Sequence, residues 1–449
     1  MPDQRARPSP ELKLRKILMA AASTALLTTA GLARAEDSSV TLYGILDTAI
    51  ANIEHAQNFD PFHPVANNPN VTKGTDAATG MLNGGMSATR WGIKGQEDMG
   101  SGFKALFLLE SGFNVGSGNL SNAALGISRN TSSGPNMSAD SAVSGQLFSR
   151  GAYVGLASGS YGTLTAGRHQ SFFLDNIAMF DPMMGSQAFS PIGFSGTYGG
   201  GGATDDSRVD SSLKYKIALG DFTLGALYKF GGISGSSTAQ GAYEINGIYT
   251  SGGLSVQLGY QAFKDAFAIS NATGTGTVKA TAEDTKSYML AAKYSWEQVT
   301  LRAGFEREEL MNPSNPASDL TVTSLYGIGL AAAPSVTAYP SQKNLNVYWL
   351  GAGYDFTPAF TLLAGAYHVS QNDYDPIGCG SGKETGRCSG SLNYYSLVGE
   401  YFLSKRTDLY AGVMKSTVSG GPAAAVANTA PTPSETSNRI VALGVRHRF

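Results

Sequence analysis

The feature that most restricts the fold of this 449-residue chain is a repeat of short amphipathic segments, with no long apolar run after the N-terminal region. A helix that crosses a membrane needs roughly 20 consecutive apolar residues, and the later chain contains no such run. Instead, apolar and other side chains alternate in segments such as Phe222–Phe230 (FTLGALYKF) and Leu254–Phe263 (LSVQLGYQAF). Glycine, aspartate and serine separate these segments. This alternation, with this punctuation, predicts β-hairpins.

The same pattern predicts sixteen strands along the chain. They are expected near residues 39–51, 86–97, 102–113, 146–158, 161–169, 208–219, 222–231, 241–250, 254–263, 285–295, 298–308, 344–355, 359–370, 392–402, 407–418 and 437–449. Very short turns alternate with long polar connections. Short turns at one end and long loops at the other are the organisation of an outer-membrane barrel, and a soluble β-sandwich has no reason to adopt it.

Closure of this sheet follows from the solvent around it. Lipid cannot satisfy the backbone groups of an open strand edge, so the strands have to close into a barrel. Sixteen strands enclose an interior too wide for side chains to fill, and such an interior holds water. The sequence therefore predicts an all-β, antiparallel transmembrane β-barrel, with short periplasmic turns and long extracellular loops.

The N-terminal region has the layout of a secretory signal. Basic residues at 5–16 precede an apolar stretch from Ile17 to Ala30, and Ala33-Arg34-Ala35 supplies a small-x-small cleavage pattern. A membrane anchor is the alternative, but the stretch is short for spanning, which takes roughly 20 residues. We predict a signal peptide over 1–35 and a barrel domain over 36–449, and hence a protein exported beyond the inner membrane.

Composition and charge agree with a barrel. Only 15% of the residues are charged and 56 are glycine, whereas soluble domains carry about 25% charged residues. Without residues 1–35, the chain has 26 basic and 32 acidic residues, a formal net charge of −6. This balance argues against a nucleic-acid partner, because nucleic-acid binding favours basic stripes.

The last predicted strand is amphipathic to its end. In RIVALGVRHRF, one face carries Val441, Leu443, Val445, His447 and Phe449. That face can contact lipid, with the terminal aromatic ring at the membrane interface. We interpret Phe449 as a C-terminal assembly signal, with the barrel-assembly machinery as a partner.

Seven segments of the chain carry a family resemblance. They are Ser39–Asp47 (SVTLYGILD), Ser87–Asp98 (SATRWGIKGQED), Phe103–Phe113 (FKALFLLESGF), Phe148–Leu156 (FSRGAYVGL), Tyr161–Arg168 (YGTLTAGR), Ser404–Tyr410 (SKRTDLY) and Gly444–Phe449 (GVRHRF). In these segments the chain resembles the general trimeric porins of Gram-negative bacteria. The resemblance implies a homotrimer in the outer membrane, in contact with lipid and lipopolysaccharide. It also implies passive diffusion of small hydrophilic solutes and ions.

The resemblance further implies that the third long loop, here residues 170–207, folds into the barrel and narrows it. Arginines suit the facing wall because they stay charged at any relevant pH, and an arginine turned to lipid would be costly. The wall candidates are Arg90, Arg150 and Arg208, with Glu110 as an acidic lumen residue. On the loop we expect Asp181 to supply the facing carboxylate, with Asp175 behind it. For each residue a structural salt bridge or a rim charge is the alternative.

No second carboxylate follows Asp181 in the stretch PMMGSQAFSPIGF. Three wall arginines against one or two acids suggest a weak preference for anions. The two cysteines, Cys379 and Cys388, lie in the loop-like stretch CGSGKETGRC. A local disulfide suits an oxidising compartment, whereas a metal site would need more ligands, and no histidine lies nearby. We predict no cofactor and no metal.

Two other functions are compatible with a barrel. The first is a substrate-specific outer-membrane channel or a surface adhesin, because the long loops near 52–85, 114–145 and 309–343 could bind partners. The second is an outer-membrane enzyme. No G-x-S-x-G or H-E-x-x-H motif is present, and the five histidines form no catalytic pattern. The sequence therefore predicts a channel and not an enzyme.

Overall fold

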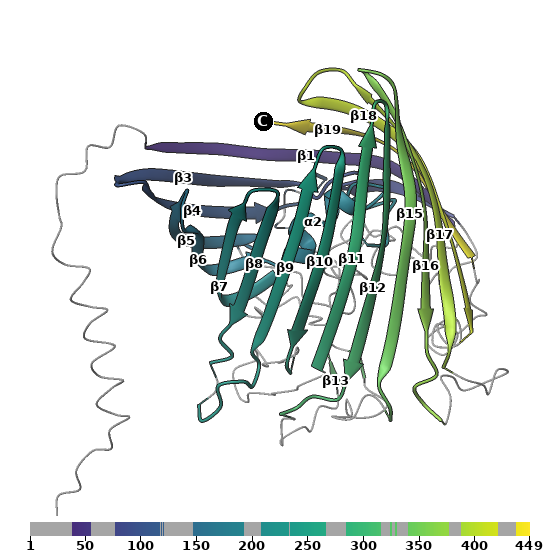
Figure 1. Ribbon diagram of the computed structural model, residues 1–449. Coiled ribbons are helices and arrows are strands. Elements are labelled where there is room, and N and C mark those ends of the chain that lie inside the picture. The colour runs from purple at the N-terminus through teal and green to yellow at the C-terminus, as the bar shows by residue number, and fades with distance from the viewer. Residues whose placement is uncertain are drawn as a thin grey trace, which may run out of the picture.

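The computed structural model describes residues 38–54, 77–116, 118, 120, 147–192, 208–232, 234–265, 284–315, 324–325, 328–329, 340–376, 388–420 and 437–449. In these residues the chain forms one antiparallel sheet that closes on itself as a barrel, because β1 pairs with β19 (Figure 1). The predicted signal peptide over 1–35 lies outside the described residues. Among the described residues, no helix is both long and apolar enough to cross a membrane.

The first half of the barrel contains ten strands and one helix. They are β1 (Ser39–Ile53), β2 (Ala78–Asn83), β3 (Arg90–Gly100), β4 (Phe103–Gly112), β5 (Gly151–Ser158), β6 (Gly162–Gln170), α2 (Phe172–Phe180), β7 (Arg208–Leu219), β8 (Phe222–Lys229), β9 (Ala242–Ser251) and β10 (Leu254–Phe263).

The second half continues the sheet to the C-terminus. Its strands are β11 (Asp284–Trp296), β12 (Val299–Met311), β15 (Lys343–Thr357), β16 (Phe360–Gln371), β17 (Gly390–Phe402), β18 (Thr407–Gly420) and β19 (Ser437–Arg448). A separate two-stranded sheet, β13 (Ser324–Leu325) and β14 (Ile328–Gly329), lies between β12 and β15 in the sequence.

The barrel wall has sixteen strand positions, as predicted, although seventeen strands form its sheet. The two counts agree because β2 and β3 share one edge of β1: β3 pairs with Ser39–Ile45 and β2 with Thr48–Ile53. The short turns, such as those between β7 and β8 or β9 and β10, lie at one end of the barrel, here called the turn end. The long connections lie at the other end, here called the loop end.

The strand predicted over 86–97 is β3, which begins later, at Arg90, and the cause is Asp47 on β1. Its buried carboxylate accepts hydrogen bonds from the backbone N–H groups of Gly85 (3.0 Å), Met86 (3.0 Å) and Ser87 (2.6 Å). Residues 84–89 therefore turn toward Asp47 and leave the ladder. The Tyr410 hydroxyl donates to the same carboxylate at 2.5 Å. The strand is therefore confirmed with a later start, and that start depends on contacts from distant parts of the chain.

The outer surface of the wall is apolar. On β19, Val441, Leu443 and Val445 are exposed, whereas Ile440 and Ala442 point inward and are buried, so the predicted alternation is confirmed. Exposed aromatic side chains lie toward both strand ends, as in the aromatic girdles of membrane barrels. They include Phe222, Trp296 and Phe356 near the turn end and Tyr228, Tyr243, Tyr348 and Tyr395 nearer the loop end.

The third long connection folds into the barrel, as expected. α2 lies inside the wall (Figure 1), and residues 181–192 continue across the interior. The indole of Trp349 on β15 donates to the Phe180 carbonyl at 3.0 Å, and the Ser396 hydroxyl on β17 donates to the Phe189 carbonyl at 2.6 Å. The part of the predicted 170–207 loop beyond Ile192 lies outside the described residues.

Closure of the barrel depends on one close approach. Gly44 on β1 and Phe449 exchange two backbone hydrogen bonds of 3.1 Å. A Cβ on Gly44 would overlap the ring of Phe449 and would lie 2.7 Å from the Arg90 carbonyl oxygen. Only glycine fits this position without displacing the terminal ring.

We expect Gly44→Ala to destabilise the folded barrel by about 1–3 kcal/mol, because overpacking displaces the Phe449 ring or the wall strands. Urea unfolding in lipid vesicles measures this change. Gly247→Ala is the matched control, because the nearest atom to its added Cβ is the Leu224 Cδ2 at an ordinary 3.6 Å. Equal stability of the two variants would contradict the prediction.

Candidate functional site

Four side chains from four segments meet inside the barrel around Glu110. This residue stands near the end of β4 and is almost fully buried. Its carboxylate accepts a hydrogen bond from Arg150 Nε at 2.7 Å and one from the Tyr43 hydroxyl at 2.8 Å. Arg90 Nε lies 3.8 Å from its second oxygen. Arg90, Arg150 and Glu110 therefore form one ion-pair cluster, here called the arginine cluster.

Local structure positions both guanidinium groups. Arg90 is the first residue of β3, where the strand resumes after the turn held by Asp47. Arg150 immediately precedes β5, so it is not the strand residue that the sequence predicted. Its backbone N–H donates to the Glu110 carbonyl at 3.1 Å. Their side chains are 26% and 11% exposed, so both remain in contact with the lumen.

Arg208 begins β7 and is fully buried. It pairs in register with Gln170, and its charge lies within electrostatic reach of Arg150, Arg168 and Glu110. Arg168 donates to the Ser149 carbonyl at 2.8 Å and pairs with Asp210 at 2.5 Å. Arg208 is thus near the arginine cluster, but its side chain is not on the water-filled surface.

Like Arg208, Asp181 is placed away from the water-filled surface that the sequence prediction gave it. It ends α2, is 0% exposed, and accepts hydrogen bonds from the Tyr367 hydroxyl (2.5 Å) and the Gly185 N–H (2.7 Å). Burial raises the pKa of this carboxyl above its usual range. Asp181 therefore fastens the loop to the wall and does not face solvent. The reason is the partner Tyr367, which lies on the far side of the barrel.

Asp175 is the loop carboxylate that remains in contact with the lumen. It lies in the first turn of α2 and pairs with Lys214 Nζ of β7 at 2.6 Å. The same ammonium group donates to the Gln170 carbonyl at 2.7 Å. Lys214 thus ties the start of the third long loop to the wall; this loop is here called the constriction loop after its predicted role.

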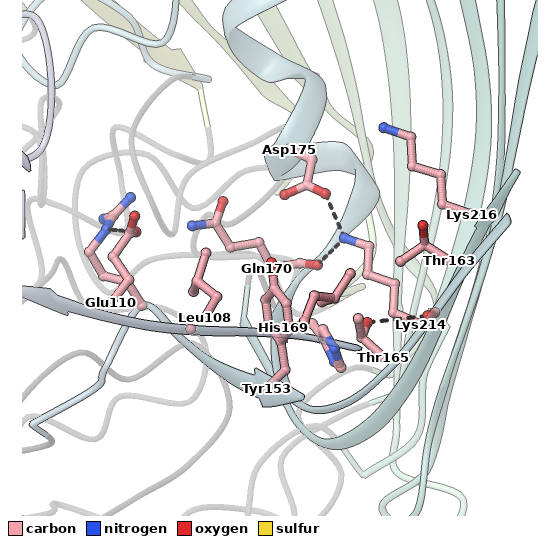
Figure 2. A pocket seen from close by; sticks show the side chains of 13 residues that line it. Leu108, Glu110, Tyr153, Thr163, Thr165, His169, Gln170, Asp175, Lys214 and Lys216 are labelled. Carbon is pink, nitrogen blue, oxygen red and sulfur yellow. Dashed lines mark hydrogen bonds and ion pairs between the residues drawn. The ribbon is translucent and has the colours of Figure 1, made fainter. Parts of the chain in front are cut away.

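A cavity of about 410 Å³ lies between this pair and the arginine cluster. Figure 2 shows Glu110 at one end, Lys214 and Lys216 at the other, and Leu108 and Tyr153 between them. The side chains come from consecutive strands β4, β5, β6 and β7. The full lining consists of Leu106, Leu108, Glu110, Arg150, Gly151, Tyr153, Thr163, Thr165, His169, Gln170, Asp175, Lys214 and Lys216.

Further cations face the lumen between the constriction loop and the turn end. Lys94 pairs in register with Leu108, which lines the cavity, so both point to the same side of the sheet. Lys104 is an even number of positions from Leu108 on β4 and therefore lies on the same face. On the opposite wall, Arg302 donates to the Met179 carbonyl of the loop at 3.0 Å, and Lys293 is its register partner. The lumen on this side of the loop therefore carries basic side chains on both walls.

The candidates predicted from the sequence did not include Tyr43, Lys214 or Lys216. The alternation of side chains along β7 could have identified the two lysines as lumen residues, because Lys214 and Lys216 alternate with the outward-facing Leu213 and Tyr215. Cys388 is disulfide-bonded, and Cys379 lies outside the described residues, so their pairing stays a prediction. Among the described residues, no group of three metal-ligating side chains is present.

A closed barrel with an inward loop and a charged lumen is the architecture of a diffusion channel of the porin class. The comparisons agree. The family model described as Gram-negative porin matches residues 22–421. An outer membrane porin protein of Bordetella pertussis is 30% identical over 97% of this chain and 100% of its own length. Outer membrane porin protein 32 of Delftia acidovorans is 29% identical over 54% of this chain and 59% of its own length.

Solved structures show the same fold. The anion-selective porin from Comamonas acidovorans has a TM-score of 0.60 at 20% identity, covering 92% of this chain and 100% of that one. OmpT of Vibrio cholerae has a TM-score of 0.56 at 15% identity, covering 92% of this chain and 98% of that one. The chain belongs to the Gram-negative porin family. It is an outer-membrane channel for passive diffusion of small hydrophilic solutes and ions.

Proposed function

We propose that this porin prefers anions, and that the arginine cluster sets the preference. The observation that carries the proposal is the charge balance at the cluster. Among the described residues, Glu110 is the carboxylate that pairs with Arg90 and Arg150, and Arg208 adds a third positive charge nearby. A constriction with excess positive charge favours anions, because the field acts directly on a partly dehydrated ion.

Four further observations support the preference. Asp181 is buried and withdrawn from the lumen, which removes one of the expected acids. Asp175 is paired with Lys214, so its charge is largely compensated. The porin from Comamonas acidovorans, which shares the fold, is anion-selective. The basic side chains on both walls near the turn end act in the same direction.

The test is the reversal potential of the purified mature protein in planar bilayers under a salt gradient. We expect stepwise conductance and a potential whose sign shows anion preference. A cation-preferring sign would overturn the proposed selectivity and leave the channel. Absence of conductance from correctly folded protein would overturn the channel itself.

The same recordings test the oligomer. We propose a homotrimer, supported by the apolar outer surface of β1, where Val40, Leu42 and Ile50 are strongly exposed. Insertion of a trimer raises the conductance in steps that each contain three equal sublevels. Conductance steps without sublevels would contradict the trimer. Since the relatives are channels, we propose no enzymatic activity.

The remaining proposals concern assembly and surroundings. We take 1–35 as a cleaved signal peptide, 170–207 as the constriction loop, and lipid and lipopolysaccharide as the surroundings of the barrel. Phe449 is proposed as the signal read by the barrel-assembly machinery. In that case its deletion lowers the outer-membrane level in cells more than it lowers refolding in detergent.

A further inference from the structure

The cavity beside the constriction loop has an apolar middle, which is unusual for a water-filled lumen. The interior of a porin is polar, because water fills it. Here Leu106 and Leu108 of β4 and Tyr153 of β5 face the cavity and are only partly buried. They leave apolar surface in contact with the solution that permeating solutes pass through.

The apolar middle is also flat and rigid. The Tyr153 ring stacks on the imidazole of His169, with centroids 4.9 Å apart and planes 22° apart. His169 is held by a 2.8 Å hydrogen bond between its Nδ1 and the Ser212 hydroxyl. Two stacked rings with fixed orientation present a surface on which another planar group can pack.

The charges around this surface are unequal. The cavity lining contains three cations, Arg150, Lys214 and Lys216, and two acids, Glu110 and Asp175. Each acid is already paired: Glu110 with Arg150 at 2.7 Å, and Asp175 with Lys214 at 2.6 Å. Lys216 is exposed and makes no ion pair with the part of the chain that the structure describes. The cavity thus offers one uncompensated cation beside an apolar surface.

We infer that this cavity is a binding subsite for monocarboxylates with a planar apolar body, of which benzoate is the simplest probe. The ring packs on Leu106, Leu108 and Tyr153, and the carboxylate faces Lys216. The Thr163 hydroxyl also lines the cavity and can donate to the carboxylate, whereas the Thr165 hydroxyl donates to the Lys214 carbonyl at 3.3 Å. The inference rests on the proposed anion preference and adds selectivity for one class among anions.

The first test uses the unaltered porin. Chloride current through bilayer-inserted channels is measured while sodium benzoate or sodium acetate is added at neutral pH. We expect benzoate to reduce the current with an apparent Kd roughly tenfold lower than that of acetate, because only benzoate buries apolar surface. Benzylammonium, which has the ring and the opposite charge, should not reduce it. Equal effects of benzoate and acetate would overturn the inference.

Variants locate the subsite. Leu108→Asn and Lys216→Gln should each weaken the benzoate effect about fivefold to tenfold, whereas Leu108→Val should retain most of it. Lys293→Gln is the matched control for Lys216→Gln. It also removes a lumen lysine on the same side of the loop, but it lies outside the cavity. If Lys293→Gln weakens the effect as much as Lys216→Gln, general anion attraction explains the binding and the subsite is wrong.

The outcomes separate this inference from the proposed function. A cation-preferring reversal potential would overturn the anion preference on which the subsite depends. An anion-preferring channel that treats benzoate and acetate alike would leave the proposed function intact and remove the subsite alone.

Discussion

Replacing both Arg90 and Arg150 by glutamine lowers the anion-to-cation permeability ratio by at least about tenfold, to near that of free solution. The two guanidinium groups lie on Glu110, at 3.8 Å and 2.7 Å from its oxygens. Among the described residues, the cluster and Arg208 together sum to two positive charges before the change and to none after it. A unit charge about 4 Å from a permeating ion changes the electrostatic energy of that ion by about 1 kcal/mol in water, and by more beside a low-dielectric wall. Removing a positive charge raises the energy of an anion in the channel and lowers that of a cation. Both changes therefore lower the anion-to-cation permeability ratio.

The measurement is the reversal potential under a potassium chloride gradient near 0.1 M, where screening extends over about 10 Å. Glu110 becomes a nearly buried carboxylate without its arginines, which is destabilising by about 3–5 kcal/mol. The triple variant, with Glu110→Gln added, removes that cost and leaves Arg208 as one net positive charge. Its permeability ratio should lie between those of the wild type and the double variant. An unchanged ratio in a folded double variant would show that selectivity is set elsewhere.

The strands of this barrel could be predicted from the sequence because their signal is local. Alternation with a period of two needs only neighbouring residues, and β10 has the predicted bounds of 254–263. The outward face of the last strand also follows from local pattern, since the alternation places Val441, Leu443 and Val445 on the lipid side. The family resemblance identified Arg90, Arg150 and Glu110, and the structure brings these three together.

The errors arise where a side chain's environment is made by distant parts of the chain. Asp181 is polar and follows a helix in a loop, so its sequence context favours exposure. Its burial depends on Tyr367, which is 186 positions away. The later start of β3, at Arg90, depends in the same way on Asp47. Such tertiary contacts override local preference, and a period-two pattern contains no information about them.

The constriction loop is held at its start by a strand carboxylate that the sequence did not reveal. Glu244 of β9 is buried, and its two oxygens accept hydrogen bonds from the N–H groups of Phe172 (2.8 Å) and Phe173 (3.1 Å). Ser171 Oγ accepts from the Leu174 N–H at 3.1 Å, and its carbonyl accepts from the Asp175 N–H at 3.0 Å. The four N–H groups that begin α2 therefore all have partners, two of them on the wall.

We expect Glu244→Ala to release the start of α2 from the wall while the barrel still folds. Two buried N–H groups lose their acceptors, at about 1–3 kcal/mol each. The open channel should close at least about tenfold more often at a given voltage. Chymotrypsin should also cleave within 172–189, where four phenylalanines become accessible. Single-channel recording and limited proteolysis measure the two effects.

Two variants show whether the cause is the lost hydrogen bonds. Glu244→Gln keeps one amide oxygen as an acceptor, so its closing rate and cleavage should lie between those of the wild type and Glu244→Ala. Glu97→Ala removes an exposed carboxylate from β3, away from the loop, and should behave as the wild type. If Glu244→Ala and Glu97→Ala match in both measurements, Glu244 does not hold the loop. In that case the other contacts fix its position: Lys214 at the start of the loop, and Asp181 and Trp349, which join the other end of α2 to β15 and β16.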